Sequence, residues 1–388
     1  MEKLITSNLK LGIIAGGQLG KMLIQEASKW DISTYVLDPE ANCPAGKIAT
    51  VFVQGSYLSY EDVLAFGRTV DVLTYEIENI HIGALKQLKT EGIRVLPDPA
   101  ILETLRDKGI QKTVFRDGFI PTSAFGLYAD KASVLSDIES GKLSYPFVQK
   151  IRIGGYDGRG VAIIDTIADH DKLFDAPSVV ELKVNIDKEI AVIAARNGKG
   201  EIRCFPAVEM VFDPQANLVE KLICPTTLSD EMAEKATAIA GRLIELIGLQ
   251  GLLAVEFFLD KAGKLWVNEV APRPHNSGHH TIESVVTSQF EQHLRAILNL
   301  PLGSTQLKMP AVMLNLLGEP GHEGPVKYEG LIECMAMEGV KIHLYGKKIT
   351  RGFRKMGHVT IIAPTLEEAI IKAEKIKKLI HVRSWNQS

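Results

Sequence analysis

The sequence is poor in cysteine, and its few cysteines are not placed for a disulfide framework. Cys43, Cys204, Cys224 and Cys334 lie far apart and show no paired spacing. This pattern argues against structural disulfides and against a zinc site built from cysteine. We therefore expect a reducing, cytoplasmic setting.

Excess basic charge and long apolar runs are also missing. The formal net charge is -3, and no apolar stretch approaches the length of a membrane span. Binding to the phosphate backbone of nucleic acid needs a basic surface, so any positive patch in this chain must be local. The N-terminus also lacks the cleavage pattern of a signal peptide. We expect a soluble protein that binds neither nucleic acid nor a membrane.

Length and element order predict more than one domain. With 388 residues, 46% of them apolar, the chain is too long for one ordinary core. Its N-terminal part alternates between strand and helix patterns, as in a parallel sheet covered by helices. The middle of the chain mixes strands with a helix that begins after Ser229 and stops at Gly248. We predict a Rossmann-like domain at 1–100, an α+β domain at 101–300 and a smaller domain at 301–388.

Local patterns give three further expectations. One helical stretch is predicted at about 100–117, before the strands of the second domain. In the third domain we expect strands around 332–339 and 357–363. A last helix is expected from Thr365, which is a suitable N-cap residue.

A glycine-rich turn lies between the first strand and the first helix. Its sequence, AGGQLG at 15–20, is similar to a dinucleotide-binding fingerprint, and Asp38 ends the next strand. The first glycine of that fingerprint is replaced by Ala15, and the turn is one residue too short for a Walker-type phosphate loop. Two interpretations remain open: a tight structural turn, or a helix N-terminus that faces an anionic or polar ligand with the N–H groups of Gln18 and Leu19.

A hairpin with a glycine-rich tip is predicted near 145–165. Lys150 ends its first strand, and the tip GGYDGRG follows. Glycines allow backbone N–H groups to approach phosphate closely, although such a tip is also typical of a mobile surface turn. Further along, Glu181 and Glu189 suit a backbone contact to an adenine edge and an acceptor for ribose hydroxyls. Solvated acidic positions on strands are the alternative for both.

Two apolar strands, LLAVEFFLD and KLWVNEV, are joined by a turn at 260–263. Pairing the two ends of this turn places Glu256 opposite Val267, with Glu269 one diagonal step away on the same sheet face. The two carboxylates would then lie roughly 7 to 8 Å apart at the backbone, close enough to share magnesium ions. Asn268 adds an amide oxygen nearby. A solvated surface position is the alternative for each glutamate.

The loop APRPHNSGHH follows directly, and its two prolines restrict the backbone. Arg273, His275 and Asn276 are therefore presented rigidly. A zinc site made by His275, His279 and His280 is the alternative, but no Cys or Glu-x-x-His partner accompanies them. We favour a substrate-binding loop.

In this order and spacing, the segments GGQLG, TYEIEN, GGYDGRG, VNEVAPRPHNSGHH and YGKKITRGFRKMGH resemble the N5-carboxyaminoimidazole ribonucleotide synthetases, a family of ATP-grasp ligases. The resemblance covers nearly the whole chain. It implies an α/β and α+β protein with an ATP-grasp fold, an N-terminal Rossmann-like (pre-ATP-grasp) domain and a small C-terminal domain. It also implies a reaction that joins bicarbonate to the exocyclic amine of 5-aminoimidazole ribonucleotide. ATP becomes ADP and phosphate, and carboxyphosphate is the expected intermediate.

The resemblance assigns residues to each ligand. ATP would be held by Lys108, Lys150, Gly154, Gly155, Tyr156, Asp157, Gly158, Arg159, Gly160, Glu181, Leu182, Lys183, Val184, Glu189, Asn268 and Glu269. The ribonucleotide would contact Gln18, Leu19, Glu76, Tyr156, Asp157, Arg273, His275, Asn276, Lys347, Arg354 and Lys355. Magnesium would bind Glu256 and Glu269, and the catalytic residues would be Arg273, His275 and Lys347.

The phosphate of the ribonucleotide would bind to Lys347, Arg354 and Lys355, which bracket a short glycine-punctuated loop. A solvated basic hairpin is the alternative for this run. Two positions depart from the family pattern. Lys108 stands where relatives commonly have Arg, so the charge is kept but not the bidentate fork. Phe212 stands where they often have an Asn-x-His segment, so no polar contact to ATP is expected near this position.

The resemblance further implies a homodimer and a mutase as a functional partner. The nearest alternative is formate-dependent glycinamide ribonucleotide transformylase, a sister enzyme that typically has Glu and Asp where this chain has Gln18 and the HNSG segment. A nucleotide-binding regulatory protein without catalysis would be expected to lack Lys150 or the carboxylate pair. An NAD dehydrogenase is suggested only by the N-terminal turn and Asp38.

Overall fold

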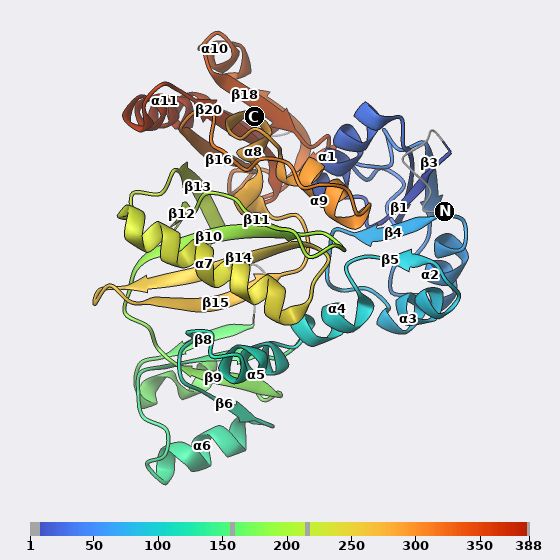
Figure 1. The fold of residues 1–388 in the computed structure, drawn as a ribbon. Helices are drawn as coiled ribbons and strands as arrows, with labels where there is room; N and C mark the ends of the chain where they lie inside the picture. The colour runs from blue at the N-terminus through green and yellow to red at the C-terminus, as the bar shows by residue number, and fades with distance from the viewer. Residues whose placement is uncertain (1–7, 156–159, 214–217, 386–388) are drawn as a thin grey trace.

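The structure, a computed structural model, describes residues 8–155, 160–213 and 218–385. Within these ranges the strands form sheets of five, four, nine and three strands (Figure 1). No helix in the same ranges is long and apolar enough to cross a membrane. The predicted mixture of α/β and α+β structure is confirmed.

The N-terminal part is a parallel sheet, as predicted, and its strand order is β3-β2-β1-β4-β5. Its central strands are buried on both faces, because helices cover each side of the sheet and the strands are largely apolar. The elements are β1 (Lys10–Ile14), α1 (Gln18–Ala27), η1 (Ser28–Trp30), β2 (Ser33–Asp38), β3 (Val51–Gln54), α2 (Tyr60–Gly67), β4 (Val72–Tyr75), α3 (Ile82–Thr90) and β5 (Arg94–Val95).

The helical stretch predicted at 100–117 is two helices, α4 (Pro99–Arg106) and α5 (Lys108–Asp117). Asp107 breaks the stretch, because its backbone is extended and its carboxylate accepts from the N–H groups of Gly109 and Ile110 as an N-cap. The same carboxylate forms a bidentate ion pair with Arg152, at 2.9 and 2.7 Å. The start of α5 is thereby fixed beside the predicted hairpin.

A small antiparallel sheet with strand order β6-β9-β7-β8 contains that hairpin. Lys150 pairs with Val161, so the two side chains share one face of this sheet. The other face packs against α6, with Phe147 and Ile164 fully buried. The elements are β6 (Phe125–Tyr128), α6 (Lys131–Glu139), β7 (Phe147–Ile151), β8 (Val161–Ile164), η2 (Ile167–Lys172) and β9 (Ser178–Leu182).

The largest sheet runs in the order β15-β14-β10-β12-β13-β16-β20-β18, with β11 added beside β10. The long helix α7 (Asp230–Ile247) lies across one face and buries Ala240 and Leu243 against Val255 and Phe257 (Figure 1). The strands are β10 (Ile186–Arg196), β11 (Ile202–Cys204), β12 (Val208–Asp213), β13 (Leu218–Cys224), β14 (Gly251–Asp260), β15 (Leu265–Ala271), β16 (Ala311–Leu317), β18 (Val340–Leu344) and β20 (Lys355–Ile362).

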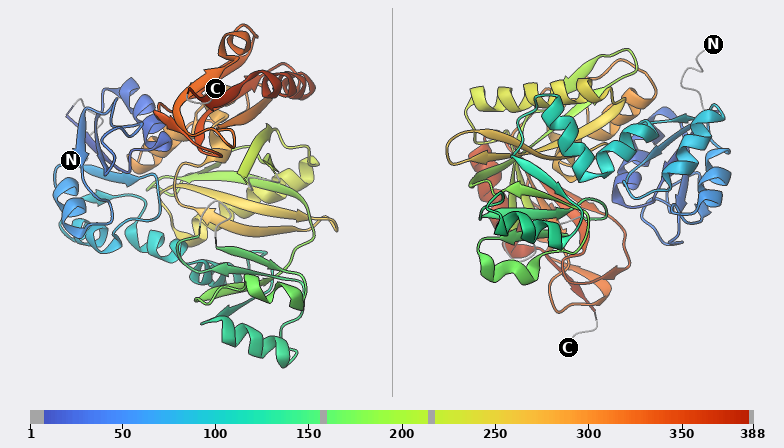
Figure 2. Two further views of the ribbon diagram at one scale, coloured as in Figure 1. Left: turned by 180° about the vertical axis from the view of Figure 1, so that it is seen from behind. Right: turned by 90° about the horizontal axis from the view of Figure 1, so that it is seen from below.

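The C-terminal part continues this sheet through β16, β20 and β18, and adds a three-stranded sheet and two helices (Figure 2). The large sheet therefore includes strands from both sides of residue 300. The predicted domain boundaries at 100 and 300 stay predictions. The remaining elements are η3 (Asn276–Gly278), α8 (Thr281–Ser284), α9 (Gln289–Ile297), β17 (Gly324–Glu329), α10 (Leu331–Met335), β19 (Ile349–Thr350), α11 (Leu366–Leu379) and β21 (His381–Ser384).

One predicted strand is wrong. The segment at 332–339 begins as the helix α10, which starts after Gly330 in a left-handed conformation with φ of 75°. Ile332 and Met335 are exposed and only Cys334 is buried, so the apolar residues do not alternate between two environments. The strand predicted at 357–363 is confirmed as β20, and the helix after Thr365 as α11.

Gly248 ends α7 with φ of 66°, and no heavy atom lies within 4 Å of the position that a Cβ would take. We expect Gly248→Ala to destabilise the protein by about 1 kcal/mol through backbone strain alone. Gly241 lies inside the same helix, where a Cβ would make only an ordinary contact at 3.5 Å with Cys204. Gly241→Ala should therefore be neutral or stabilise by up to about 1 kcal/mol. Urea unfolding midpoints measure both, and shifts of the same sign would contradict this account.

Candidate functional site

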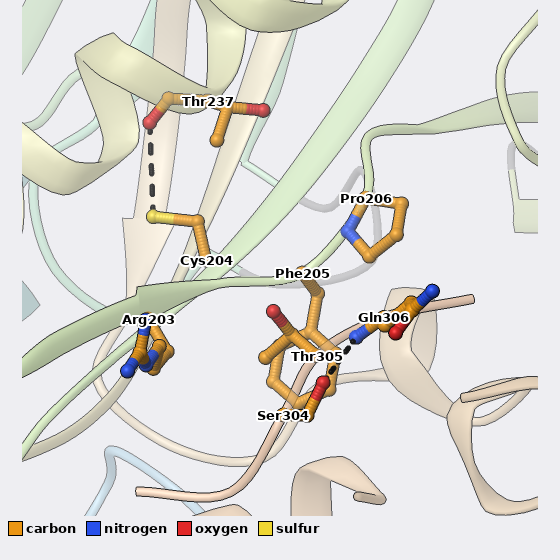
Figure 3. A pocket seen from close by; sticks show the side chains of 8 residues that line it. All are labelled: Arg203, Cys204, Phe205, Pro206, Thr237, Ser304, Thr305 and Gln306. Atoms are coloured by element: carbon orange, nitrogen blue, oxygen red, sulfur yellow. Dashed lines mark hydrogen bonds between the residues drawn. The ribbon is translucent and has the colours of Figure 1, made fainter. Parts of the chain in front are cut away.

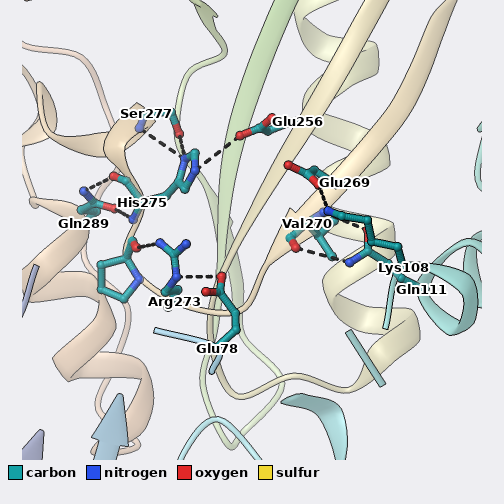
Figure 4. A network of polar contacts seen from close by, with 11 residues as sticks. Glu78, Lys108, Gln111, Glu256, Glu269, Val270, Arg273, His275, Ser277 and Gln289 are labelled. Atoms are coloured by element: carbon teal, nitrogen blue, oxygen red, sulfur yellow. Dashed lines mark hydrogen bonds and ion pairs between the residues drawn. The ribbon is translucent and has the colours of Figure 1, made fainter. Parts of the chain in front are cut away.

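The candidate site lies where α5, the β14–β15 hairpin and the loop after β15 meet. Figure 4 shows side chains of these three segments pointing toward one another. From the small sheet, Lys150 Nζ reaches Asn268 Oδ1 of β15 at 2.7 Å. The facing surfaces of the two sheets are thereby joined through polar side chains.

The hairpin corrects the predicted register of the two glutamates. Phe257 pairs with Val267, whereas Glu256 pairs directly with Glu269. Asn268 is therefore an extra residue in β15, a β-bulge. The prediction that Glu256 lies opposite Val267, with Glu269 one diagonal step away, is wrong. The two glutamates share one face, as expected, but they stand opposite each other.

The pKa values of the two carboxyl groups are shifted in opposite directions. Burial and the neighbouring Glu269 raise the pKa of Glu256. Lys108, which donates to Glu269, holds the pKa of that carboxyl below its ordinary value. On β10, burial raises the pKa of Glu189 to about 7. The carboxyl groups of Glu189, Glu256 and Glu269 thus lie within electrostatic reach of one another.

His275 is neutral, and its imidazole lies close to the carboxyl group of Glu256. Its Nε2 lies 3.4 Å from Glu256 Oε1, while Nδ1 accepts from the N–H of Ser277 at 3.3 Å and lies 2.9 Å from its Oγ. Because Nδ1 is an acceptor, the ring proton is on Nε2. Burial, followed by the charge of Arg273, lowers the pKa of His275 to about 3.

The loop that carries Arg273 and His275 is held from two sides (Figure 4). Arg273 Nε donates to Glu78 Oε1 of the N-terminal part at 2.8 Å. Gln289, at the start of α9, accepts from His275 N–H at 2.9 Å and donates to its carbonyl oxygen at 2.7 Å. A Cβ on Gly278 would lie 2.5 Å from Gln289 Cδ, so only glycine allows this approach.

Gln289 was not predicted to belong to the site. Its sequence signal is a polar residue on the buried stripe of an amphipathic helix, where Gln292 and His293 are also buried. Such a stripe normally carries apolar residues, so buried polar groups on it must find partners in the tertiary structure.

Lys150 is held between an amide and a carboxylate. Its Nζ lies 2.7 Å from Asn268 Oδ1 and 3.1 Å from Glu181 Oε1. Although burial acts against it, Lys150 and Lys112 lower the pKa of Glu181 to about 2. The Glu181 side chain is thus the counter-ion of two lysines, whereas its predicted contact to adenine concerns the backbone.

Lys112 was not predicted to belong to the site either. Its Nζ lies 2.8 Å from Glu181 Oε2 and 2.7 Å from Thr122 Oγ1, and its side chain is 3% exposed. The available signal was the spacing of Lys108, Lys112 and Phe115, which places two lysines on the stripe of α5 that carries a core aromatic residue.

The N-terminal glycine turn bonds to two carboxylates of its own domain. Glu76 accepts from the N–H groups of Gly17 and Gly20, the latter at 2.7 Å, and Asp38 accepts from Gly16 N–H at 2.7 Å. A Cβ on Gly17 would collide with the Glu76 carboxylate. The turn is therefore tight, as in the first interpretation, and a ligand contact of the Gln18 and Leu19 N–H groups stays a prediction.

The basic loop of the C-terminal part lies near this turn. Lys347 Nζ donates to the carbonyl oxygen of Lys355 at 2.8 Å, and Arg354 Nη1 donates to that of Ile349 at 2.7 Å. Burial, then the charge of Arg354, lowers the pKa of Lys347 to about 8, while Glu76 acts in the opposite direction. Lys347 thus lies within electrostatic reach of Glu76, and Arg354 and Lys355 lie within electrostatic reach of Lys347.

The remaining predicted residues have these places. Tyr156, Asp157, Gly158 and Arg159 lie outside the described residues. At the hairpin tip, Gly154 and Gly160 have φ of 89° and 76°, which suits glycine. Half-buried or exposed positions are found for Gly155, Gln18, Asn276, Phe212, Leu182, Lys183 and Val184, whereas Leu19 is buried.

The zinc alternative is not supported in the described part of the chain, where no three His, Cys, Asp or Glu side chains are grouped to hold a metal ion. His280 Nδ1 lies 2.8 Å from Ser284 Oγ, and His279 Nδ1 lies 3.3 Å from Gln289 Nε2. Both histidines are fully buried, and burial lowers the pKa of each.

A separate pocket of about 550 Å³ lies on another part of the molecule, beside α7 (Figure 3). Its lining consists of Arg203, Cys204, Phe205, Pro206, Thr237, Ser304, Thr305 and Gln306. None of these residues belongs to the predicted site, and the pocket contributes nothing to it.

Three domain families match the chain. They are the ribonucleotide synthetase preATP-grasp domain over residues 9–106, the ATP-grasp domain over 113–290 and the phosphoribosylaminoimidazole carboxylase C-terminal domain over 311–372. Fold and domain content therefore define an ATP-grasp ligase, which binds ATP.

Similar proteins narrow this class. The N5-carboxyaminoimidazole ribonucleotide synthase of Brucella melitensis is 35% identical over 360 residues, which are 91% of this chain and 96% of that protein. The crystal structure of the synthetase from Thermotoga maritima is 43% identical with a TM-score of 0.89, and the likeness covers 97% of this chain and 99% of that one. The chain belongs to the N5-carboxyaminoimidazole ribonucleotide synthetase family of ligases, whose role is in purine biosynthesis.

Two further comparisons bear on ligands and length. A structure from Aspergillus clavatus, in complex with ADP and 5-aminoimidazole ribonucleotide, is 31% identical with a TM-score of 0.88, covering 96% of this chain and 99% of that one. The chain spans 64% of the length of the chloroplastic phosphoribosylaminoimidazole carboxylase of Vigna aconitifolia, to which it is 36% identical.

The environment of His275 predicts its protonation state. We expect the Nε2–H tautomer to persist from pH 8 down to about pH 5, because burial lowers the pKa to about 3. Two-bond nitrogen–proton correlation spectra of histidine-labelled protein check this. The folded pKa lies below the unfolded value, so the contribution of His275 to stability is lost as the pH falls from about 6.5 toward 3. A His275 signal that titrates with a midpoint near 6.5 would contradict the geometry.

Proposed function

We propose that this chain uses ATP to join bicarbonate to the exocyclic amine of 5-aminoimidazole ribonucleotide. The products are N5-carboxyaminoimidazole ribonucleotide, ADP and phosphate, and carboxyphosphate is the activated intermediate. Family membership supports this reaction, as does the relative solved with ADP and 5-aminoimidazole ribonucleotide. The observation that carries the site is the direct opposition of Glu256 and Glu269 beside Lys108 and Lys150.

We assign ATP to the space between the small sheet and the β14–β15 hairpin. Val161 and Ile163 expose apolar side chains on the face of the small sheet that carries Lys150, which suits the adenine ring. On the hairpin side of this space, the ring centroid of Phe258 lies 6.0 Å from Lys150 Nζ. Lys150 and the backbone of the glycine-rich tip would then meet the phosphates.

The residues fit magnesium, although the assignment is a proposal. Two opposed carboxylates and the amide oxygen of Asn268 are hard oxygen donors, as this ion prefers. Burial and the neighbouring Glu269 raise the pKa of Glu256, so a divalent cation would displace its proton and stabilise the charged form of the carboxylate. When bound, magnesium would neutralise the phosphates of ATP during transfer.

We assign the ribonucleotide to the loop after β15 and the facing N-terminal turn. Asn276 Nδ2 is buried and has no hydrogen-bond partner in the described part of the chain, so it can donate to a ligand. Arg273 would stabilise the developing carboxyphosphate with Nη2, because Nε donates to Glu78 and Nη1 to the carbonyl oxygen of Pro274. The neutral His275 would orient the substrate. Because its pKa is lowered to about 3, it is not protonated at neutral pH and cannot serve as a general acid there.

A direct assay tests this proposal. ADP release is measured with 5-aminoimidazole ribonucleotide, with and without bicarbonate, beside glycinamide ribonucleotide with formate. We expect full activity only with the first substrate and bicarbonate together. Equal or faster turnover with glycinamide ribonucleotide and formate would reassign the chain to the sister activity.

Several further assignments belong to this proposal. They are the homodimer, the cytoplasmic setting, cooperation with a mutase and the division of the chain near residues 100 and 300. Light scattering measures the first of these directly.

The carboxylate pair generates the next prediction. Glu269→Gln should reduce turnover at least about a thousandfold, because it removes one of two charges that would hold magnesium on the ATP phosphates. The fold should remain, since glutamine keeps the volume and Lys108 is partly exposed to water. Turnover is measured over a range of magnesium concentrations beside circular dichroism. Near-normal ATP consumption by this variant would remove the assignment.

The basic loop generates another. Arg354→Ala should weaken ribonucleotide binding by roughly 2 to 4 kcal/mol and leave ATP affinity nearly unchanged, because the guanidinium would pair with the ribose phosphate. Lys348 is exposed on the same loop and serves as the control. Calorimetric titration with each ligand separates the effects. Equal losses for both ligands, or an equal defect in Lys348→Ala, would show that the phosphate is bound elsewhere.

A further inference from the structure

Lys112 is buried at the place where α5, the small sheet and the large sheet meet. Besides Glu181 and Thr122, its Nζ contacts the carbonyl oxygen of Val267 at 3.4 Å. Burying an ammonium group costs free energy unless the group is paired. An apolar side chain of similar length would fill this space without that desolvation penalty. The charge of Lys112 therefore calls for an explanation beyond packing.

Glu181 divides its two oxygens between two lysines. Oε2 lies 2.8 Å from Lys112 Nζ and accepts from Ser123 Oγ at 2.6 Å, while Oε1 lies 3.1 Å from Lys150 Nζ. One carboxylate thus faces two ammonium groups, and the three side chains together carry one net positive charge. Without Lys112, Glu181 and Lys150 would form a neutral pair.

We propose that Lys112 is a positioning residue for the nucleotide phosphates. Lys112 neutralises the charge of Glu181. The positive charge of Lys150 is then not balanced by Glu181 and can attract a phosphate. Lys112 acts through Glu181, because its ammonium group is enclosed by protein atoms. The inference rests on the proposed placement of ATP phosphates at Lys150.

The test is a charge-restoring pair of variants. Lys112→Met removes the charge and keeps the length, and we expect it to weaken binding of a non-hydrolysable ATP analogue with magnesium at least about tenfold. Lys112→Met combined with Glu181→Gln leaves Lys150 as the one charge of the cluster. We expect this double variant to bind the analogue within about threefold of the parent protein, since Asn268 still holds Lys150.

Isothermal titration measures these affinities, with 5-aminoimidazole ribonucleotide as the second ligand, whose binding should change less than about twofold. Arg116→Met is the matched control, because Arg116 lies one turn further along α5 and is exposed. Thermal unfolding accompanies each titration, and the double variant should fold because it replaces a buried charge pair by neutral groups.

Two results would overturn the inference: affinity of Lys112→Met within twofold of the parent, or a double variant that binds no better than Lys112→Met. In either case Lys112 fills space and its charge has no part in nucleotide binding. Lys150→Met separates this failure from that of the proposed site. If Lys150→Met keeps full affinity, the placement of the ATP phosphates is wrong. If Lys150→Met loses affinity while Lys112→Met does not, the phosphate site stands and only the proposed role of Lys112 is wrong.

Discussion

Two glutamates held face to face are the constraint on which the rest of the site depends. A single extra residue in β15, Asn268, brings Glu269 opposite Glu256 and offers its own amide oxygen to Lys150. Burial makes two adjacent negative charges costly, so cations must be supplied from elsewhere. Lys108 comes from the start of a helix and Lys150 from a second sheet, and the arrangement of these elements around the hairpin satisfies that need.

Much of the fold was predictable because periodicity and capping are local properties. The parallel N-terminal sheet, the hairpin of Lys150 and the helix between Ser229 and Gly248 were predicted and are confirmed. The break at Asp107 was missed, although aspartate is a good N-cap, because both flanking segments are helical and a cap inside such a run has no apolar signal. The short helix α10 was mistaken for a strand, since a few exposed apolar residues show no reliable period.

Those features of the site that follow from residue type were predictable. Those that depend on strand register or on burial were not. The pattern of alternation put Glu256 and Glu269 on one face, but a bulge adds a residue without leaving a mark in the hydrophobic pattern. Lys112 and Gln289 were missed for a related reason. Each acts through partners far away in the sequence, and a polar residue on an apolar stripe reveals only that some partner must exist.

The N-terminal turn shows how charge selects a ligand for a widely used motif. In dinucleotide-binding folds, the N–H groups at such a helix start receive a pyrophosphate. Here Glu76 already accepts from Gly17 and Gly20, and Asp38 accepts from Gly16. A pyrophosphate would find these donors engaged and would face two carboxylates, so like-charge repulsion acts against NAD in addition to the missing first glycine. The same carboxylates suit hydroxyl and amine groups, and this requires the phosphate of a ribonucleotide to lie further away. Lys347 lies within electrostatic reach of Glu76 but on a separate part of the chain, where we propose that this phosphate binds.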